Sequence, residues 1–201
     1  MRSRSPDVAN GTVPDDGILA CVLLATERLV LRRFRPDDVE VFASYRSDPG
    51  IARFQSWEPP VSLAAATALV EEFVTADPRS PGWFQYAVEL RSERLLIGDV
   101  GVNLHDNRMQ AEIGFTVAAA YQGHGYAVEA VRRVVDHLFA DQGLRRISAE
   151  CDARNLRSAR LLERAGFRRE GCRVANTWIK GEWTDDLLFG LLAENWRGPG
   201  R

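Results

Sequence analysis

The sequence is poor in cysteine, and its few cysteines are badly placed for cross-linking. Cys21, Cys151 and Cys172 are odd in number and widely spaced, and no two of them form a C-x-x-C pair. Disulfide-rich secreted domains and zinc modules depend on closely spaced cysteines in pairs. We therefore expect no disulfide framework and no metal site, and a reducing, cytoplasmic setting.

The sequence also lacks an excess of charge of either sign. Lysine and arginine together number 26, aspartate and glutamate number 28, and the formal net charge is −2. Proteins that bind nucleic acid usually carry a dominant basic face, so we expect no nucleic-acid partner. The hydrophobic fraction of 45% is that of an ordinary globular protein, and 201 residues are enough for one domain with its own core.

A long hydrophobic run is missing as well. The stretch "ILACVLLA" at 18–25 follows an N-terminus with two arginines, as in a signal peptide, but two aspartates directly precede it. It is far too short to cross a bilayer. We therefore expect no membrane association, a disordered tail over 1–17, and a single domain over 18–201.

The first part of the chain contains a strand pattern followed by two helix patterns. Alternating leucines in "TERLVLRRF", from Thr26 onward, predict a strand. Pro36 is suited to open a helix, "SDPG" at 47–50 breaks it, and Ser62 is suited to cap a second helix. The two helices, joined by an aromatic-bearing linker, are expected to form a wall or a lid.

The middle and last parts alternate between strands and helices. The segments 83–91, 95–104 and 110–117 predict an antiparallel meander, because their connections are too short for crossovers. Three glycines inside these strands indicate bulges or close backbone approach, namely Gly98, Gly101 and Gly114. The later elements expected are a helix at 126–142 stopped by Gly143, a strand at 145–152, a helix between Asn155 and Gly166, and one or two strands, of which 184–192 is the clearest.

A glycine loop, "YQGHGYA" at 121–127, lies between a predicted strand and a predicted helix. Such a junction binds anions, because free backbone N–H groups and the helix dipole both point at the loop. The loop lacks the G-K-[ST] ending of a nucleoside-triphosphate site, and Val128 stands where a dinucleotide motif has its third glycine or alanine. Taken alone, the two glycines are compatible with a simple turn.

Three co-linear segments make the loop more specific. They are "AEIGFTV" at 111–117, "QGHGYA" at 122–127 and "NLRSARLLERAGF" at 155–167. Together they resemble the GNAT superfamily of acetyl-CoA-dependent N-acetyltransferases. The pattern Q/R-x-x-G-x-G/A is matched by Gln122, Gly125 and Ala127, and the pattern N-x-x-S with a helix ending in G-F is matched by Asn155, Ser158, Gly166 and Phe167. The segment 26–54 resembles the opening of the RimJ/RimL-like branch, which contains the ribosomal-protein-alanine N-acetyltransferases.

The resemblance covers about Thr26 to Leu192 and implies both a fold and an activity. The fold is α/β, with a mixed, mostly antiparallel sheet of about seven strands, flanked by helices and splayed at the acetyl-CoA cleft. The activity is direct transfer of acetyl from acetyl-CoA to a primary amine of a small molecule or a protein N-terminus. The alternative is a catalytically idle acyl-CoA-binding or interaction module, and a homodimer is compatible with either.

The resemblance also assigns residues to the cofactor. The backbone amides of the loop would hold the pyrophosphate, the end of the preceding strand would line the pantetheine arm, and Asn155 would contact it. The loop residues are Gln122, Gly123, His124, Gly125, Tyr126 and Ala127, and the strand residues are Phe115, Thr116 and Val117. The Val117 amide would polarise the thioester carbonyl. We expect the His124 side chain to point at solvent. The structural alternatives to these cofactor roles are that the strand residues pack in the core and that Asn155 caps the following helix.

Two side chains are candidates for the proton transfers. Glu112 matches a glutamate that many relatives use as the base, often through water, and Ser158 is the candidate proton donor to the leaving thiolate. The alternatives are that Glu112 is an ordinary strand residue and that Ser158 is an ordinary residue of the first helical turn. Cys151 is expected to be a buried, inert thiol.

The acceptor site is the least determined part. Phe54 and Trp57 are expected to form one wall, and Trp178 and Trp183 another, although packing within a hairpin also explains the last two. Four acids are compatible with attraction of a cationic amine or with ordinary exposed turns, namely Glu58, Glu182, Asp185 and Asp186. A protein N-terminus, an aminoglycoside, a polyamine and a small amine metabolite all remain open.

Overall fold

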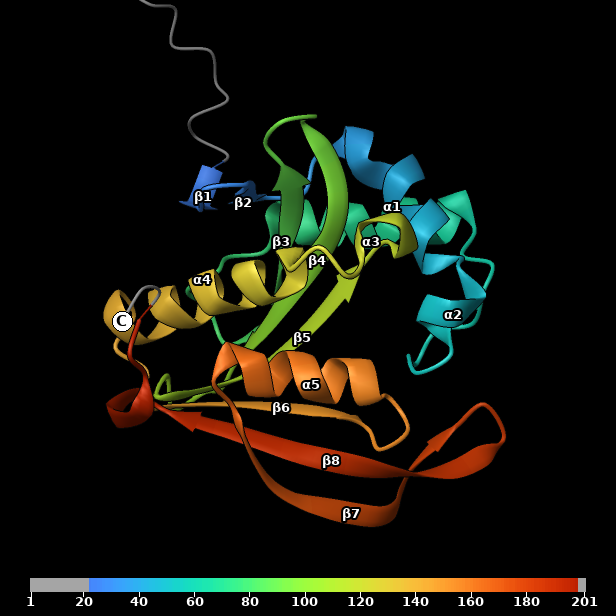
Figure 1. Cartoon of the computed structure of the whole chain (residues 1–201). Helices are drawn as coiled ribbons and strands as arrows, with labels where there is room; N and C mark the ends of the chain where they lie inside the picture. The colour runs from blue at the N-terminus through green and yellow to red at the C-terminus, as the bar shows by residue number, and fades with distance from the viewer. Residues whose placement is uncertain (1–21, 199–201) are drawn as a thin grey trace, which may run out of the picture.

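The computed structural model describes residues 22–198, so the predicted tail over 1–17 lies outside the described residues. The described chain forms an eight-stranded sheet in the order β1-β2-β3-β4-β5-β6-β8-β7 (Figure 1). The strands are β1 (Val22–Ala25), β2 (Leu29–Arg32), β3 (Gly82–Leu90), β4 (Leu95–Leu104), β5 (Gln110–Val117), β6 (Arg146–Asp152), β7 (Arg168–Ile179) and β8 (Glu182–Leu192). The α/β fold and the mostly antiparallel sheet are confirmed, with one strand more than expected.

Every strand pair is antiparallel except β5 and β6, which run parallel. The meander β3–β4–β5 is as predicted. The extra strand is β1, which pairs with β2 where the sequence predicted a single strand, and the one or two strands expected at the end of the chain are the long hairpin β7–β8. The sequence pattern of β7 is no clear strand signal, because nearly all of its side chains are exposed and therefore show no alternation between apolar and polar residues.

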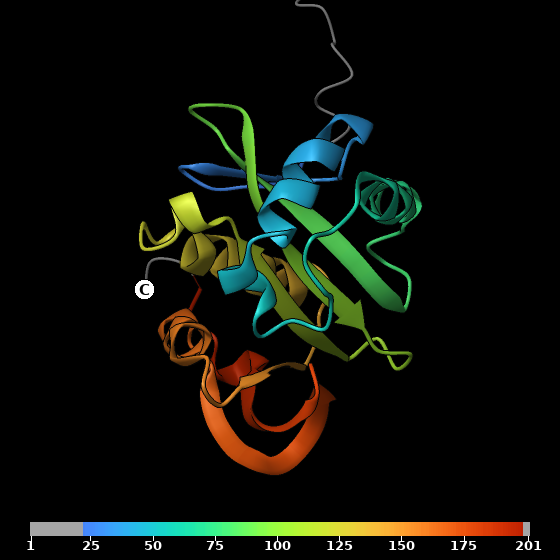
Figure 2. The same ribbon diagram turned by 90° about the vertical axis from the view of Figure 1, so that its right-hand side faces the viewer.

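Helices cover both faces of the sheet. They are α1 (Val39–Arg46), α2 (Pro49–Ala52), α3 (Leu63–Thr75), α4 (Tyr126–Ala140) and α5 (Leu156–Ala165), with 3-10 turns η2 (Pro36–Asp38), η3 (Ala119–Tyr121) and η4 (Ala193–Asn195). Figure 2 shows α1 and α3 on one side of the central strands and α4 and α5 on the other. None of the helices in the described part of the chain is long and apolar enough to span a bilayer.

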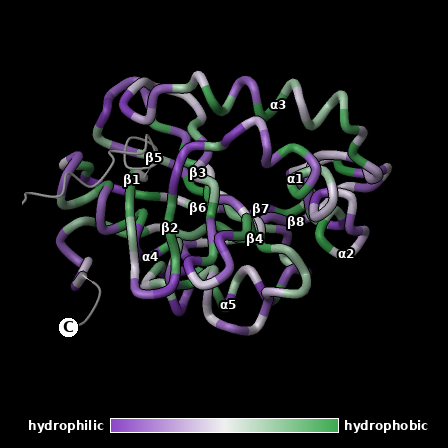
Figure 3. Tube along the Cα trace, turned by 90° about the horizontal axis from the view of Figure 1, so that it is seen from above, coloured by the Kyte–Doolittle hydropathy of each residue, from purple (hydrophilic) through white to green (hydrophobic). Residues whose placement is uncertain are grey.

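The two faces bury two separate hydrophobic cores because side chains of a strand alternate between faces. Tyr86 and Val88 of β3 belong to the core beneath α4 and α5, whereas Ala87 between them belongs to the core beneath α1 and α3. On α3, hydrophobic and polar residues alternate along the trace (Figure 3), and Ala66 and Val70 are its buried positions.

Local sequence signals set most of the helix ends. The Ser62 hydroxyl accepts from the Ala65 N–H, and Asn155 Oδ1 accepts from the Ser158 N–H, so both predicted caps are confirmed. The prediction for 47–50 is wrong in part. Asp48 accepts from the N–H groups of Gly50 and Ile51 and so starts a further short helix, α2, where only a break was expected.

The starts and ends of two predicted helices also shift. The helix expected from Pro36 begins as the 3-10 turn η2, and its α-helical part starts at Val39. The helix α4 ends at Ala140, so Gly143 follows the helix rather than stopping it directly. Such shifts of a few residues arise because the last turns of helices fray.

The strand glycines differ from one another. A Cβ on Gly98 would lie 2.2 Å from the Thr116 carbonyl oxygen, and the β3–β4 register shifts beside it, so the expected close approach is confirmed there. At Gly101 the close neighbour is the Gln85 side chain rather than backbone. The expectation is wrong for Gly114, where a Cβ would meet nothing within 4 Å.

Candidate active site

A cleft of about 1040 Å³ opens where β5 and β6 part. The parallel pairing of the two strands joins Gln110–Glu112 to Arg146–Ser148 and extends no further. Beyond that point Phe115, Thr116 and Val117 line the cleft. The splay implied by the family resemblance is therefore present, and its other walls are α2, the glycine loop and α5.

The backbone of β5 turns one N–H group toward this cleft. The Ala118 N–H donates to the Ile97 carbonyl on the β4 side. Successive peptide groups of a strand point to opposite sides, so the Val117 N–H and carbonyl point away from β4 and into the cleft. The Gln122 side chain donates to that carbonyl at 2.9 Å. The Val117 amide therefore faces the cleft, and its role as an oxyanion donor stays a prediction.

The glycine loop closes one end of the cleft. Gly123 and Gly125 both have φ of 83°, a conformation that glycine adopts at little cost. Gly125 directly precedes α4, so the free N–H groups of the first turn of that helix face the loop. The loop residues lining the cleft are Gln122, Gly123, Gly125, Tyr126 and Ala127. His124 is exposed, as expected, and its ring stacks on Tyr126 at 5.8 Å between centroids.

Arg28 holds the loop from the side of β2, a role that no sequence pattern predicted. Its guanidinium donates to the His124 carbonyl at 3.1 Å and to Glu129 at 2.7 Å, and lies 4.6 Å from the Tyr126 ring centroid. Burial alone would raise the pKa of Glu129, but hydrogen bonds from Thr26 and Arg28 outweigh it and lower that pKa. Arg28 and Glu129 are 101 positions apart, so no local pattern marks the pair.

Asn155 and Ser158 line the cleft at the N-terminal end of α5. The cap bond between Asn155 Oδ1 and the Ser158 N–H shows that capping contributes to the presence of Asn155. The Ser158 side chain is half-buried. Both residues are therefore placed as expected, and their roles toward the cofactor stay predictions.

Three arginines on α5 also line the cleft, and they were not among the predicted site residues. Arg157, Arg160 and Arg164 are exposed and lie on one face of the helix, because residues three and four apart are neighbours there. Arg157 donates to Gln122 Oε1 at 3.4 Å. The spacing of the three arginines is visible in the sequence and is a usable signal for an anion-binding face.

Glu112 lies where β5 and β6 begin to part, outside the residues that line the cleft. Val117 lies five positions further along β5, which at about 3.3 Å per residue is roughly 16 Å. A base at this distance from the Val117 amide has to act through water. Burial, and to a lesser degree repulsion from Glu150, raises the pKa of Glu112.

Cys151 is half-buried on β6. Burial, with the negative charges of Asp152 and Asp186, raises the pKa of its thiol to about 11. A thiol in this state is a poor nucleophile, because the thiolate is the reactive form. This agrees with the expectation of an inert side chain. Across residues 22–198, no group of three or more His, Cys, Asp or Glu side chains is placed to hold a metal ion.

A family model described as "Acetyltransferase (GNAT) domain" matches residues 28–168. The chain belongs to the GNAT acetyltransferase family. It is similar to the uncharacterized N-acetyltransferase YoaA of Bacillus subtilis, with 32% identity over 85% of this chain and 96% of that protein. It is also similar to the [ribosomal protein uS5]-alanine N-acetyltransferase of Escherichia coli, with 27% identity over 90% of this chain and 95% of that protein. A GNAT-family acetyltransferase structure from Bacillus anthracis matches with a TM-score of 0.78 and 27% identity, over 85% and 98% of the two chains. The protein is thus an acetyl-CoA-dependent acetyltransferase.

The residues expected at the acceptor site of this GNAT protein are only partly brought together. Phe54 lines the cleft. Trp57 does not: its indole N–H donates to the Arg46 carbonyl at 2.9 Å, and its ring lies 4.1 Å from the Arg46 guanidinium. Trp178 and Trp183 pair across the β7–β8 hairpin at 5.4 Å between centroids, are 60% and 61% exposed, and also lie outside the cleft lining.

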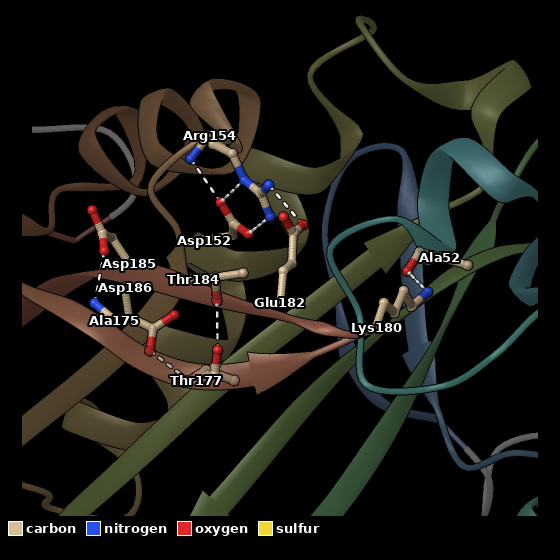
Figure 4. A network of polar contacts seen from close by, with 10 residues as sticks. All are labelled: Ala52, Asp152, Arg154, Ala175, Thr177, Lys180, Glu182, Thr184, Asp185 and Asp186. Carbon is tan, nitrogen blue, oxygen red and sulfur yellow. Dashed lines mark hydrogen bonds and ion pairs between the residues drawn. The ribbon is translucent and has the colours of Figure 1, made fainter.

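The acids near the hairpin are engaged in hydrogen bonds. Glu182 accepts from Arg154, Asp185 accepts from the Ala175 N–H, and Asp186 accepts from Asn176 and Thr177. Glu58 is exposed and does not line the cleft. Figure 4 shows Arg154 between Asp152 and Glu182, and Lys180 reaching from the hairpin toward Ala52.

Proposed function

We propose that this protein binds acetyl-CoA as its co-substrate and transfers the acetyl group directly to a primary amine. The observation that carries the proposal is the parting of β5 and β6. It leaves the Val117 N–H facing a cleft that ends at the glycine loop. This arrangement supports an oxyanion donor and a pyrophosphate site within one cleft.

The chain offers a donor set that fits coenzyme A. The amides of 122–127 and the N-terminal end of α4 would receive the pyrophosphate, and Phe115, Thr116 and Val117 would lie along the pantetheine arm with Asn155 opposite. The three arginines of α5 line the same cleft and add positive charge for phosphates. This agreement between backbone donors and side-chain charge supports the assignment.

The reaction needs two proton transfers. The acceptor ammonium, with a pKa near ~10, must lose a proton before its nitrogen attacks the thioester carbon. The carbon–sulfur bond then breaks, and the thiolate, whose conjugate acid has a pKa near ~8.5, takes up a proton. Glu112 would accept the first proton through water and Ser158 would supply the second. Direct attack forms no acyl-enzyme, so the high pKa of Cys151 is no obstacle.

A binding and product assay tests the proposal. Acetyl-CoA affinity is measured by calorimetry, and amines are then screened for release of free coenzyme A, with mass spectrometry of the acetylated product. Binding and an N-acetylated product are expected. Tight binding with no transfer to any amine would instead favour the idle acyl-CoA-binding module. We infer a cytoplasmic setting because Cys151 and Cys172 form no disulfide within residues 22–198, and free thiols persist under reducing conditions.

A further inference from the structure

Arg53 places a positive charge at the acceptor end of the cleft, with no ion-pair partner among residues 22–198. It follows α2, lines the cleft beside Phe54, and lies 5.1 Å from the Phe54 ring centroid. Within residues 22–198 no carboxylate lies within ion-pair distance of its guanidinium, although the neighbouring Arg154 has two such partners. The side chain is exposed, so a ligand in the cleft can reach it.

The nearby acids are already committed to other groups. Arg154 binds Asp152 at 2.7 Å and Glu182 at 2.8 Å, and Asp186 accepts from Thr177 at 2.6 Å (Figure 4). The pKa of Asp152 is lowered, mainly by its hydrogen bond from Arg154 and also by the charge of Arg53. Arg53 is thus within electrostatic range of this cluster without being neutralised by it.

The tip of the β7–β8 hairpin adds a second cation to the same end. The Lys180 ammonium donates to the Ala52 carbonyl at 2.6 Å, directly before Arg53 in the chain. In the described part of the chain, Lys180 has no carboxylate within ion-pair distance either. The contact ties the hairpin to α2 next to Arg53, and Lys180 itself lies outside the residues that line the cleft.

The charged residues that line the cleft are all positive. Its described residues include five arginines and no aspartate or glutamate. Three of the arginines lie on α5 beside the glycine loop, where the proposed cofactor presents its phosphates, and a fourth, Arg154, is paired with Asp152 and Glu182. Arg53 lies on the α2 wall instead, so its charge is left for the other substrate. A polycationic acceptor would be repelled here, and a neutral one would leave Arg53 without a partner.

We propose that Arg53 binds an anionic group of the acceptor, a carboxylate or a phosphate, a few bonds from the amine that is acetylated. A guanidinium suits this task because its fork of N–H donors matches the two oxygens of such a group. The proposal rests on the proposed acetyltransferase function and narrows its acceptor class. Among the acceptors that the sequence leaves open, it favours amino acids and acidic peptide N-termini over polyamines and aminoglycosides.

Matched acceptor pairs test the proposal. Coenzyme A release is measured for amino acids against their carboxamides, for peptides beginning Ala-Glu against Ala-Gln, and for aminoalkyl phosphates against the corresponding amino alcohols. The anionic member of at least one pair is expected to have a kcat/KM about 10- to 100-fold higher, the size of one charge-assisted hydrogen-bond pair. The pair with the largest ratio identifies the source of the anionic group.

Variants then assign the preference to this residue. Arg53→Gln should raise the KM of the anionic acceptor and abolish its advantage, while the KM for acetyl-CoA stays the same. Arg53→Lys should retain part of the advantage, because the charge remains but the fork of donors is lost. Arg79→Gln is the matched control, since Arg79 is exposed and outside the cleft lining, and it should leave both KM values unchanged.

Two results would overturn the proposal in different ways. Equal or better use of neutral and cationic amines would eliminate the role of Arg53 and leave the acetyltransferase function intact. No transfer to any amine, with acetyl-CoA still bound, would remove the proposed function and the Arg53 role together.

Discussion

At the cofactor end of the cleft, backbone N–H groups face the proposed ligand together with the arginines of α5, whereas at the acceptor end the charged groups are side chains alone. The glycine loop, the first turn of α4 and the Val117 amide present N–H groups whose positions are fixed by the fold. At the opposite end, Arg53 and Lys180 are exposed side chains at the ends of short or projecting elements. Backbone donors serve a ligand that does not change, whereas side chains on projecting elements can differ between relatives without disturbing the sheet.

The comparison predicts that changes at one end should leave binding at the other end intact. The largest effect is expected from Glu112→Gln, which preserves shape and removes the basic oxygen. General-base catalysis is worth about 10²- to 10⁴-fold in rate, so kcat/KM should fall by that order. Acetyl-CoA affinity, measured by calorimetry, should not change, because Glu112 lies outside the cleft lining.

The pH profile separates this role from a structural one. Burial and Glu150 raise the pKa of Glu112, so kcat/KM in the parent protein should rise with pH at a higher value than for an exposed glutamate. That rise should be missing in Glu112→Gln. The pKa of Glu112 is higher in the folded than in the unfolded protein, so folding takes up a proton. The free energy of unfolding should therefore decline as the pH rises through the folded-state pKa, and it should decline less in Glu112→Gln. Full activity with the same pH profile would leave water or a backbone carbonyl as the base.

Gly125→Asp is expected to have the next largest effect, on the cofactor end alone. The substitution puts a side chain with negative charge where the pyrophosphate is proposed to bind, in a backbone conformation that a non-glycine residue rarely adopts. Acetyl-CoA affinity should fall about 100-fold, a change of about 2.7 kcal/mol.

Gly143→Asp is the matched control for this experiment. Gly143 has φ of 71°, and a Cβ added there would meet nothing within 4 Å, so the substitution carries similar backbone strain outside the cleft. The control should lose some stability and keep its affinity. Equal affinity in folded Gly125→Asp and Gly143→Asp would place the pyrophosphate elsewhere.

Ser158→Ala tests the proposed proton donor, which lies where the cofactor and acceptor ends of the cleft meet. A proton donor to the thiolate acts only in the transition state, so kcat should fall, by about 10-fold, while the KM values change little. The Asn155 cap uses the Ser158 backbone N–H, which the variant keeps, so the melting temperature should stay close to that of the parent. Unchanged turnover with chemistry rate-limiting would reduce Ser158 to a residue of the first helical turn.

The same contrast explains which parts of the site the sequence predicted. Gly125, Asn155 and the end of β5 line the cleft as the family resemblance implied, and the motifs that carry this resemblance are short runs of neighbouring residues, whereas the roles of the three toward the cofactor stay predictions. Local patterns record such features directly. The meander and the helix caps were predicted for the same reason, because they are local, whereas the splayed sheet was implied by the family resemblance.

The contacts that the sequence did not predict join distant positions. Arg28 meets Glu129 across 101 positions, and Lys180 meets Ala52 across 128. Trp57 was expected in the acceptor site on residue type alone, and its position against Arg46 depends on how the linker folds back on α1. A single sequence carries no record of pairings set by tertiary packing.

Lys180→Met carries the smallest expected effect and tests how independent the two ends are. The change keeps the length of the side chain and removes the ammonium that bonds to the Ala52 carbonyl. Because the Lys180 side chain is exposed, the bond should be worth no more than about 1 kcal/mol, so the melting temperature should shift only slightly. Loosening the hairpin from α2 should raise the KM of the preferred acceptor about 2- to 5-fold, and Lys180→Arg should restore most of it. The KM for acetyl-CoA is the internal standard. If it rises in parallel with the acceptor KM, the hairpin also shapes the cofactor end, and the two ends of the cleft are coupled rather than separate.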